Sequence, residues 1–134
     1  MALILVVEDE RSIRQAIQFE LDDEGYDVHC ASGFQEALSA LRAFDYDLII
    51  SDIFLDDGNG VQLMEIARKL NKQSPFIVIS AFPDSDLALQ VKQALNDRFF
   101  EKPFFAEDLK EKACEILKNS MGDSGSLGQT AFCH

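Results

Sequence analysis

The chain has 134 residues, of which 47% are hydrophobic and 27% charged, and these values suit one folded domain with a single core. Its formal net charge of −12 disfavours direct binding to nucleic acid or to an anionic membrane surface, because both are negatively charged. No apolar run approaches the roughly 20 residues that span a bilayer, and the first residues, MALILVVEDE, lack the basic segment of a secretory signal. We therefore expect a cytoplasmic protein.

Apolar runs and helical spacing alternate along the first third of the chain. Leu3–Val7 is a continuous apolar run rich in β-branched residues, which is typical of a strand covered on both faces. A helical stripe of apolar residues follows and is expected to end near Gly25. Residues 26–31, YDVHCA, alternate as an edge strand does. Ser32 with Gln35 three positions later is the signature of a capping box, which predicts that Ser32 caps the next helix.

The same rhythm continues to about residue 117. Strand-like runs occur at 47–51 (DLIIS), 76–80 (FIVIS) and 98–101 (RFFE), and helical stripes at 34–41, 63–70, 87–95 and 109–117. Five strands alternating with five helices predict an α/β fold with a parallel sheet and helices on both faces. From about Met121 the sequence becomes aperiodic and rich in Gly and Ser. We therefore divide the chain into a domain at 1–120 and a segment at 121–134 that is a flexible tail, a linker remnant or residues added for expression.

Polar residues cluster at the predicted ends of the strands. Glu8 and Asp9 follow the first strand, Asp52 the third, Ser80 the fourth and Lys102 the fifth. The carboxyl ends of parallel strands meet at one edge of the sheet, so we expect these side chains to converge. Carboxylates without His or Cys favour Mg²⁺, with Mn²⁺ as a substitute, and the lysine and serine suit the oxygens of a phosphoryl group. Asp52 is the best-placed nucleophile.

Four motifs, ILVVEDE, DIFLDDGNG, VISA and EKPF, occur in the order and at the approximate spacing found in the receiver domain of two-component response regulators. The chain resembles that family from Leu3 to about Asn119. The resemblance implies a flavodoxin-like, doubly wound five-stranded parallel sheet, (βα)5, with strand order 2-1-3-4-5. It also implies a cis bond between Lys102 and Pro103.

The resemblance assigns roles to the residues at the predicted edge. Asp52 is expected to be the phosphoacceptor. Asp9 and the backbone carbonyl of Phe54 are expected to bind the metal directly with Asp52, and Glu8 to act mainly through water.

Three further residues are assigned to the response to phosphorylation. Ser80 is expected to be the switch hydroxyl that turns toward the phosphate, and Lys102 to be the counter-charge. Phe99 is expected to be the switch aromatic that moves inward when Ser80 does.

The resemblance implies a signalling phosphoacceptor that assists only its own phosphorylation and dephosphorylation, and so is not an enzyme in the usual sense. The implied donor is a sensor histidine kinase, a phosphotransfer protein or a small phosphodonor. Phosphorylation is expected to change the surface of the fourth helix, fifth strand and fifth helix, which then controls an output domain or a protein partner, or forms a homodimer. The sequence fits an N-terminal module and a stand-alone regulator almost equally well.

Alternative functions meet specific objections in the sequence. A flavodoxin that binds FMN needs glycines and hydroxyls after the first strand, where this chain has EDERS. A phosphohydrolase with paired aspartates needs an acid where Phe54 stands, and a receiver-like module that never takes phosphate normally loses acidic or lysine residues that are kept here. Asp56 and Asp57 do not fit the spacing of an EF-hand, and we expect both to be solvated turn residues.

Overall fold

The structure is a computed structural model that describes residues 2–120, so the segment proposed as a tail, 121–134, lies outside the described residues. None of the helices in this range is long and apolar enough to cross a membrane. The elements of the main sheet and its covering helices, in chain order, are β1 (Leu3–Val7), α1 (Arg11–Asp23), β2 (Asp27–Ala31), α2 (Phe34–Ala43), β3 (Leu48–Asp52), α3 (Gly60–Lys69), β6 (Phe76–Ser80), α4 (Asp86–Ala94), β7 (Phe99–Glu101) and α5 (Ala106–Ser120).

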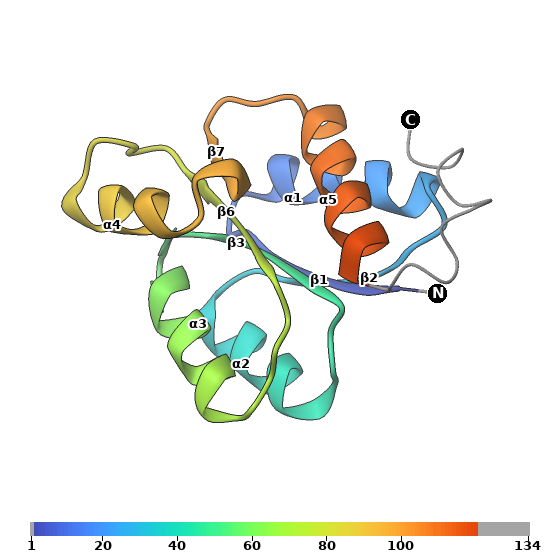
Figure 1. Ribbon diagram of the computed structural model, residues 1–134, viewed down its shortest axis with the longest axis horizontal. Coiled ribbons are helices and arrows are strands. Elements are labelled where there is room, and N and C mark those ends of the chain that lie inside the picture. The colour runs from blue at the N-terminus through green and yellow to red at the C-terminus, as the bar shows by residue number, and fades with distance from the viewer. Residues whose placement is uncertain (1, 121–134) are drawn as a thin grey trace.

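The five main strands form one parallel sheet in the order β2-β1-β3-β6-β7. This order is the predicted 2-1-3-4-5 arrangement, and the flavodoxin-like fold class is confirmed. Figure 1 shows α1 and α5 on one side of the sheet and α2 and α3 on the other. The core contacts of α4 place it on the same face as α2 and α3. The Lys102–Pro103 bond is cis, as expected.

Each face of the sheet has its own hydrophobic core, and β1 contributes to both. Leu5 and Val7 pack under α2, α3 and α4, whereas Ile4 and Val6 pack under α1 and α5. All four side chains are completely buried. Successive side chains of a strand point to opposite faces, so a strand covered on both faces must be apolar at every position. This requirement explains the unbroken apolar run at the start of the chain.

A small hairpin between β3 and α3 was not predicted from the sequence. Its strands are β4 (Phe54–Leu55) and β5 (Gly58–Asn59), which pair antiparallel. Strands of two residues are too short to produce an alternating pattern. Asn59 then caps α3 in a capping box with Gln62, because each residue accepts a hydrogen bond from the other's backbone N–H.

Helix α2 does not begin with the predicted capping box. Its N-cap residue is Gly33 instead of Ser32. The Ser32 hydroxyl donates to Glu36 Oε1 at 3.0 Å, and the first two N–H groups of the helix, those of Phe34 and Gln35, donate to the Asp57 carboxylate. The predicted role of Ser32 is therefore wrong, because the helix begins after Gly33 and a carboxylate from a distant loop accepts its first N–H groups.

Candidate functional site

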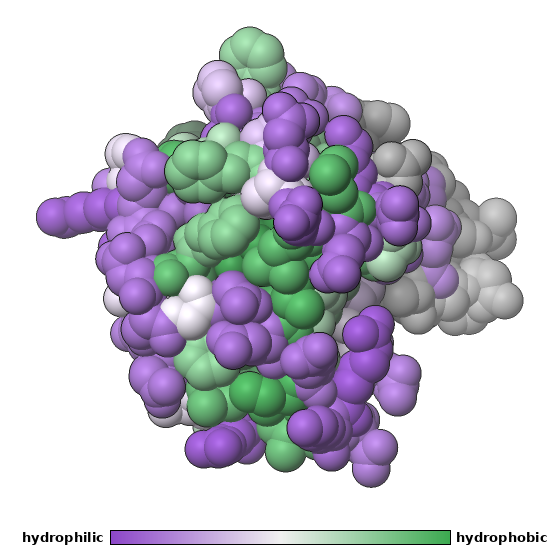
Figure 2. Space-filling view, turned by 90° about the vertical axis from the view of Figure 1, so that its left-hand side faces the viewer, coloured by the Kyte–Doolittle hydropathy of each residue, from purple (hydrophilic) through white to green (hydrophobic). Residues whose placement is uncertain are grey.

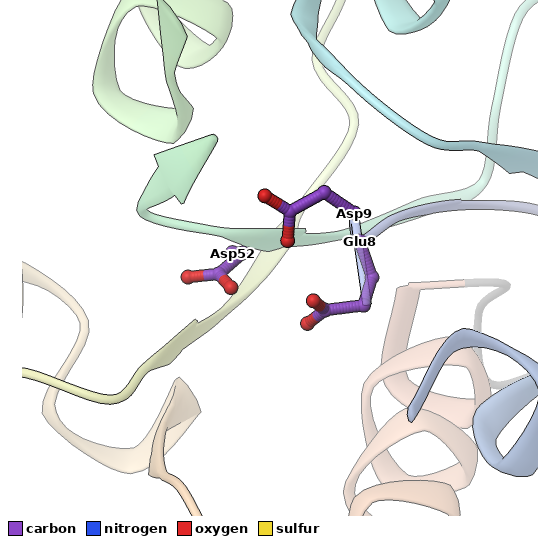
Figure 3. A group of neighbouring side chains, drawn as sticks. All are labelled: Glu8, Asp9 and Asp52. Atoms are coloured by element: carbon purple, nitrogen blue, oxygen red, sulfur yellow. The ribbon is translucent and has the colours of Figure 1, made fainter. Parts of the chain in front are cut away.

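Three carboxylates meet at the carboxyl edge of the sheet, as the sequence predicted. Glu8 and Asp9 follow β1, and Asp52 is the last residue of β3 (Figure 3). One oxygen from each of the three lies within 4.8 Å of the others. Glu8 is 0% exposed and Asp52 is 4% exposed, whereas Asp9 is half-buried. Carboxylates packed this closely with so little solvent need a cation to stay ionised.

Lys102 brings a positive charge to this cluster from the end of β7. Its Nζ lies 2.7 Å from Asp52 Oδ2 and 3.1 Å from Glu8 Oε1. Its backbone N–H donates to the Ser80 carbonyl at 2.8 Å, which fixes the lysine relative to the end of β6. Glu8, Asp52 and Lys102 are therefore brought together from three strand ends.

Two opposing effects set the pKa values in the cluster: burial disfavours the charged form of each side chain, and contacts between carboxylates and Lys102 favour it. Burial raises the pKa of Glu8 to about 7, and nearby Asp52 adds to this effect while Lys102 opposes it. Burial also raises the pKa of Asp52, against the opposing effect of its hydrogen bond with Lys102. Burial lowers the pKa of Lys102, but its contacts with Asp52 and Glu8 outweigh this and the net pKa is raised. One lysine therefore compensates only part of the charge of three carboxylates.

The donor set fits a divalent ion such as Mg²⁺. All three side chains offer hard oxygen ligands, which Mg²⁺ prefers. Within residues 2–120, the buried Oε1 of Glu8 accepts no hydrogen bond, although Lys102 Nζ lies 3.1 Å away. The Phe54 N–H donates to Asp52 Oδ1 at 3.2 Å, so the backbone of Phe54 lies next to the cluster. The residues present can thus hold a metal ion.

Glu8→Gln is expected to stabilise the metal-free protein at high pH. The pKa of Glu8 is about 7 when folded, against 4.5 as its ordinary value, so the cost of ionising the buried side chain builds up between these two pH values and is complete above pH 7. In EDTA, the variant should exceed the wild type by about 3 kcal/mol in free energy of unfolding at pH 8 and by about 1 kcal/mol or less at pH 5. Urea denaturation at both pH values measures this. The control variant is Glu65→Gln, which removes an exposed carboxylate on α3, outside the cluster, and should not give this gain. For Glu8→Gln, an equal gain at both pH values would contradict the assignment.

The two residues with predicted switch roles are not part of the cluster: Ser80 lies beside Lys102, and Phe99 lies earlier in β7, in register with Val78 of β6. Ser80 is completely buried at the end of β6, and its Oγ accepts a hydrogen bond from the Phe82 N–H at 2.9 Å. Within residues 2–120, no hydrogen bond joins Ser80 Oγ to Lys102 or to the carboxylates. Phe99 is half-buried in β7 and packs against the core on the α2–α4 face.

Two backbone contacts at the site had no signature in the sequence. The Glu10 N–H donates to Glu8 Oε2 at 3.0 Å, and the Arg14 guanidinium donates to the Glu8 carbonyl at 2.9 Å. Both depend on the turn between β1 and α1. A main-chain partner is present at every position, so residue type alone does not reveal such contacts.

An aromatic pair also flanks the site. The rings of Phe54 and Phe82 meet edge to face with centroids 5.6 Å apart. Phe54 follows Asp52 by two residues and Phe82 follows Ser80 by two, so the pair connects the loops after β3 and β6. Phe82 is 62% exposed. The sequence placed two bulky residues here, but the structure was needed to show that they touch.

Comparisons with known proteins agree on one family. The model of the response regulator receiver domain matches residues 4–114. The response regulator ArlR of Staphylococcus aureus is 34% identical over 88% of this chain and 53% of its own length. The transcriptional regulatory protein PmrA of Pectobacterium parmentieri is 28% identical over 92% of this chain and 55% of its own length. The chain thus spans about half the length of these curated relatives.

A solved structure gives the same result. The response regulator TrrA of Thermotoga maritima, solved in complex with Mg²⁺ and BeF, is 35% identical, with a TM-score of 0.72 over 87% of this chain and 99% of that chain. The match of the family model over most of the sequence agrees with the strand order and with the cluster at the sheet edge. The chain belongs to the response regulator receiver domains of two-component signalling systems.

Proposed function

We propose that the chain is a phosphorylatable receiver in which Asp52 accepts a phosphoryl group. The main support is the position of Asp52, a buried carboxylate at a strand end that contacts Lys102 and lies beside two further acids. A carboxylate oxygen of Asp52 attacks phosphorus and forms an acyl phosphate. The bond from phosphorus to the donor breaks, and its electron pair leaves with the donor. The donor is a phosphohistidine on a sensor histidine kinase or phosphotransfer protein, or a small phosphodonor.

Mg²⁺, with Mn²⁺ as a substitute, is the proposed cofactor. Asp9, Asp52 and the Phe54 carbonyl would hold the ion, and Glu8 would act mainly through water. When bound, the ion supplies positive charge that offsets the carboxylates and the oxygens of the incoming phosphoryl group. The acidic cluster supports this assignment, and so does the presence of Mg²⁺ in the complex of TrrA. Lys102 would pair with the remaining phosphoryl oxygens.

Phosphorylation is proposed to act on the surface formed by α4, β7 and α5. Ser80 would leave its hydrogen bond with the Phe82 N–H and turn toward the phosphate, and Phe99 would move inward with it. The loop after β6 is then free to shift between two arrangements. Leu89 on α4 is 45% exposed, and Phe82 in the loop before α4 is 62% exposed, so both add apolar area at or beside this surface. Figure 2, which faces the side of α3 and α4, shows hydrophobic residues gathered among polar ones. An output domain, a protein partner or a second copy of the chain would bind there.

Removal of divalent metal is expected to abolish phosphorylation. With acetyl phosphate and Mg²⁺, intact-mass spectrometry should show a gain of one phosphoryl group, and peptide mapping should assign it to Asp52. Excess EDTA should reduce that gain at least about a hundredfold, because the charge of the carboxylates then opposes an anionic donor. Restoring Mg²⁺ is the control for damage by the chelator. A full gain in EDTA, or a phosphoryl group at another residue, would contradict the proposal.

A further inference from the structure

The hairpin β4–β5 contacts α2 as well as the site. Its first residue, Phe54, follows Asp52 by two positions, and its backbone N–H donates to Asp52 Oδ1. At the other strand, a Cβ added to Gly58 would lie 2.6 Å from Cγ of Phe34, the first residue of α2. The hairpin backbone therefore rests directly on the Phe34 side chain, and only glycine permits this approach.

Asp57, at the turn of the hairpin, bonds to the start of α2. Its Oδ1 accepts from the Phe34 N–H at 2.6 Å and its Oδ2 from the Gln35 N–H at 3.1 Å. These are the first two N–H groups of the helix, and the N-cap residue Gly33 has no side chain to satisfy them. Asp57 was expected to be a solvated turn residue. It is exposed, but it supplies the cap from 22 and 23 positions away in the sequence.

The electrostatics agree with this geometry. The hydrogen bonds from the Gln35 and Phe34 N–H groups lower the pKa of the Asp57 carboxyl, so it is ionised at neutral pH. A negative charge at the positive end of a helix is also favourable. The neighbouring residue Asp56 is exposed, and within residues 2–120 its side chain makes no hydrogen bond. Asp56 and Asp57 are thus adjacent exposed acids, of which Asp57 is hydrogen-bonded to α2.

We infer that Asp57 is a positioning residue for the metal site, because it anchors the hairpin that carries Phe54 to the N-terminus of α2. The hairpin is also fixed at Asn59, which caps α3, and at Phe54, which bonds to Asp52. Of these three hydrogen-bonded anchors, Asp57 is the one that bonds to α2. Without it, the turn of the hairpin loses its hydrogen bonds to α2 and keeps the packing of Gly58 on Phe34, so the Phe54 carbonyl is held less firmly. The inference rests on the proposed function, in which that carbonyl is a metal ligand.

The first measurement compares Mg²⁺ affinity in three proteins by calorimetric titration. Asp57→Ala is expected to raise the dissociation constant of Mg²⁺ about tenfold, the lower end of the effect of residues that orient metal ligands. Asp56→Ala removes the same charge one position away and should leave the constant within about twofold of the wild type, since it breaks no bond to α2. Equal constants for Asp57→Ala and the wild type would overturn the inference.

A second variant separates positioning from helix stability. Gly33→Asp combined with Asp57→Ala moves the capping carboxylate onto the N-cap residue of α2 itself. Gly33 has an extended backbone that any residue adopts, and the atom nearest to its added Cβ is Asp57 Oδ1, which the alanine removes. The net charge matches the wild type. Thermal stability should recover from the loss in Asp57→Ala, whereas the dissociation constant of Mg²⁺ should stay raised about tenfold.

The outcomes of these measurements are distinct. If the double variant recovers both stability and Mg²⁺ affinity, Asp57 is merely a helix cap and the positioning role is overturned. If affinity stays low while stability recovers, the link between hairpin and α2 is what supports the metal site. If the wild type itself binds no Mg²⁺, the proposed function is wrong, and the role of Asp57 falls with it.

Discussion

Asp52→Asn should eliminate the gain of a phosphoryl group from acetyl phosphate in the presence of Mg²⁺. The amide has nearly the shape of the carboxylate but is not a nucleophile, so no acyl phosphate forms. Asp52 is 4% exposed and its pKa is raised by burial, so a neutral side chain fits this position without cost to the fold. Intact-mass spectrometry should show complete loss of the gain, a larger effect than we expect from any other single substitution at the site.

The matched control is Asp56→Asn, which makes the same chemical change in the same loop. Asp56 is exposed and lies outside the carboxylate cluster, so this variant should gain a phosphoryl group to the same extent as the wild type. Circular dichroism should give the wild-type helix signal for both variants. A phosphoryl gain that persists in Asp52→Asn would show that the acceptor is another residue.

Replacing Phe54 and Phe82 together by smaller polar residues, as in Phe54→Asn with Phe82→Ser, should speed the loss of phosphate. The two rings meet edge to face, and the backbone of Phe54 bonds to Asp52, so we expect the bulk of the rings to hinder the water that attacks the acyl phosphate. The wild type is therefore expected to dephosphorylate slowly. The double variant should lose its phosphoryl group about tenfold faster, which corresponds to a barrier lower by about 1.4 kcal/mol. The decay of the phosphorylated mass after removal of the donor measures both rates.

Leu89→Ser provides the control for this experiment. Leu89 is a large exposed hydrophobic residue, like Phe82, but it lies on α4 and is not part of the aromatic pair. Its replacement should leave the decay rate unchanged. If the double variant also decays at the wild-type rate, the rings do not shield the phosphate and the idea is rejected.

The fold and the composition of the site follow from the sequence to a large extent. Strands buried on both faces leave a clear apolar pattern: β1 is apolar at every position, and β3 is apolar at Leu48, Ile49 and Ile50 before it ends in the polar residues of the sheet edge. Once the alternation of strands and helices predicts a parallel sheet, residues directly after the strands must share one edge. Lys102 is 94 positions from Glu8 and 50 positions from Asp52 in the sequence. Their convergence could still be predicted, because the topology of a parallel sheet requires it.

Contacts made by loops were decided only by the tertiary structure. The capping signature at Ser32 and Gln35 was intact in the sequence, but Glu36 binds the serine and Asp57 caps the helix instead. The ring contact between Phe54 and Phe82 likewise joins two loops that are distant in the sequence. Apolar burial imposes a repeating pattern along the chain, whereas a hydrogen bond or a ring contact between distant loops needs only one suitable group at each end. The sequence therefore determined which chemistry meets at the sheet edge, and the packing of the loops determined how that chemistry is held.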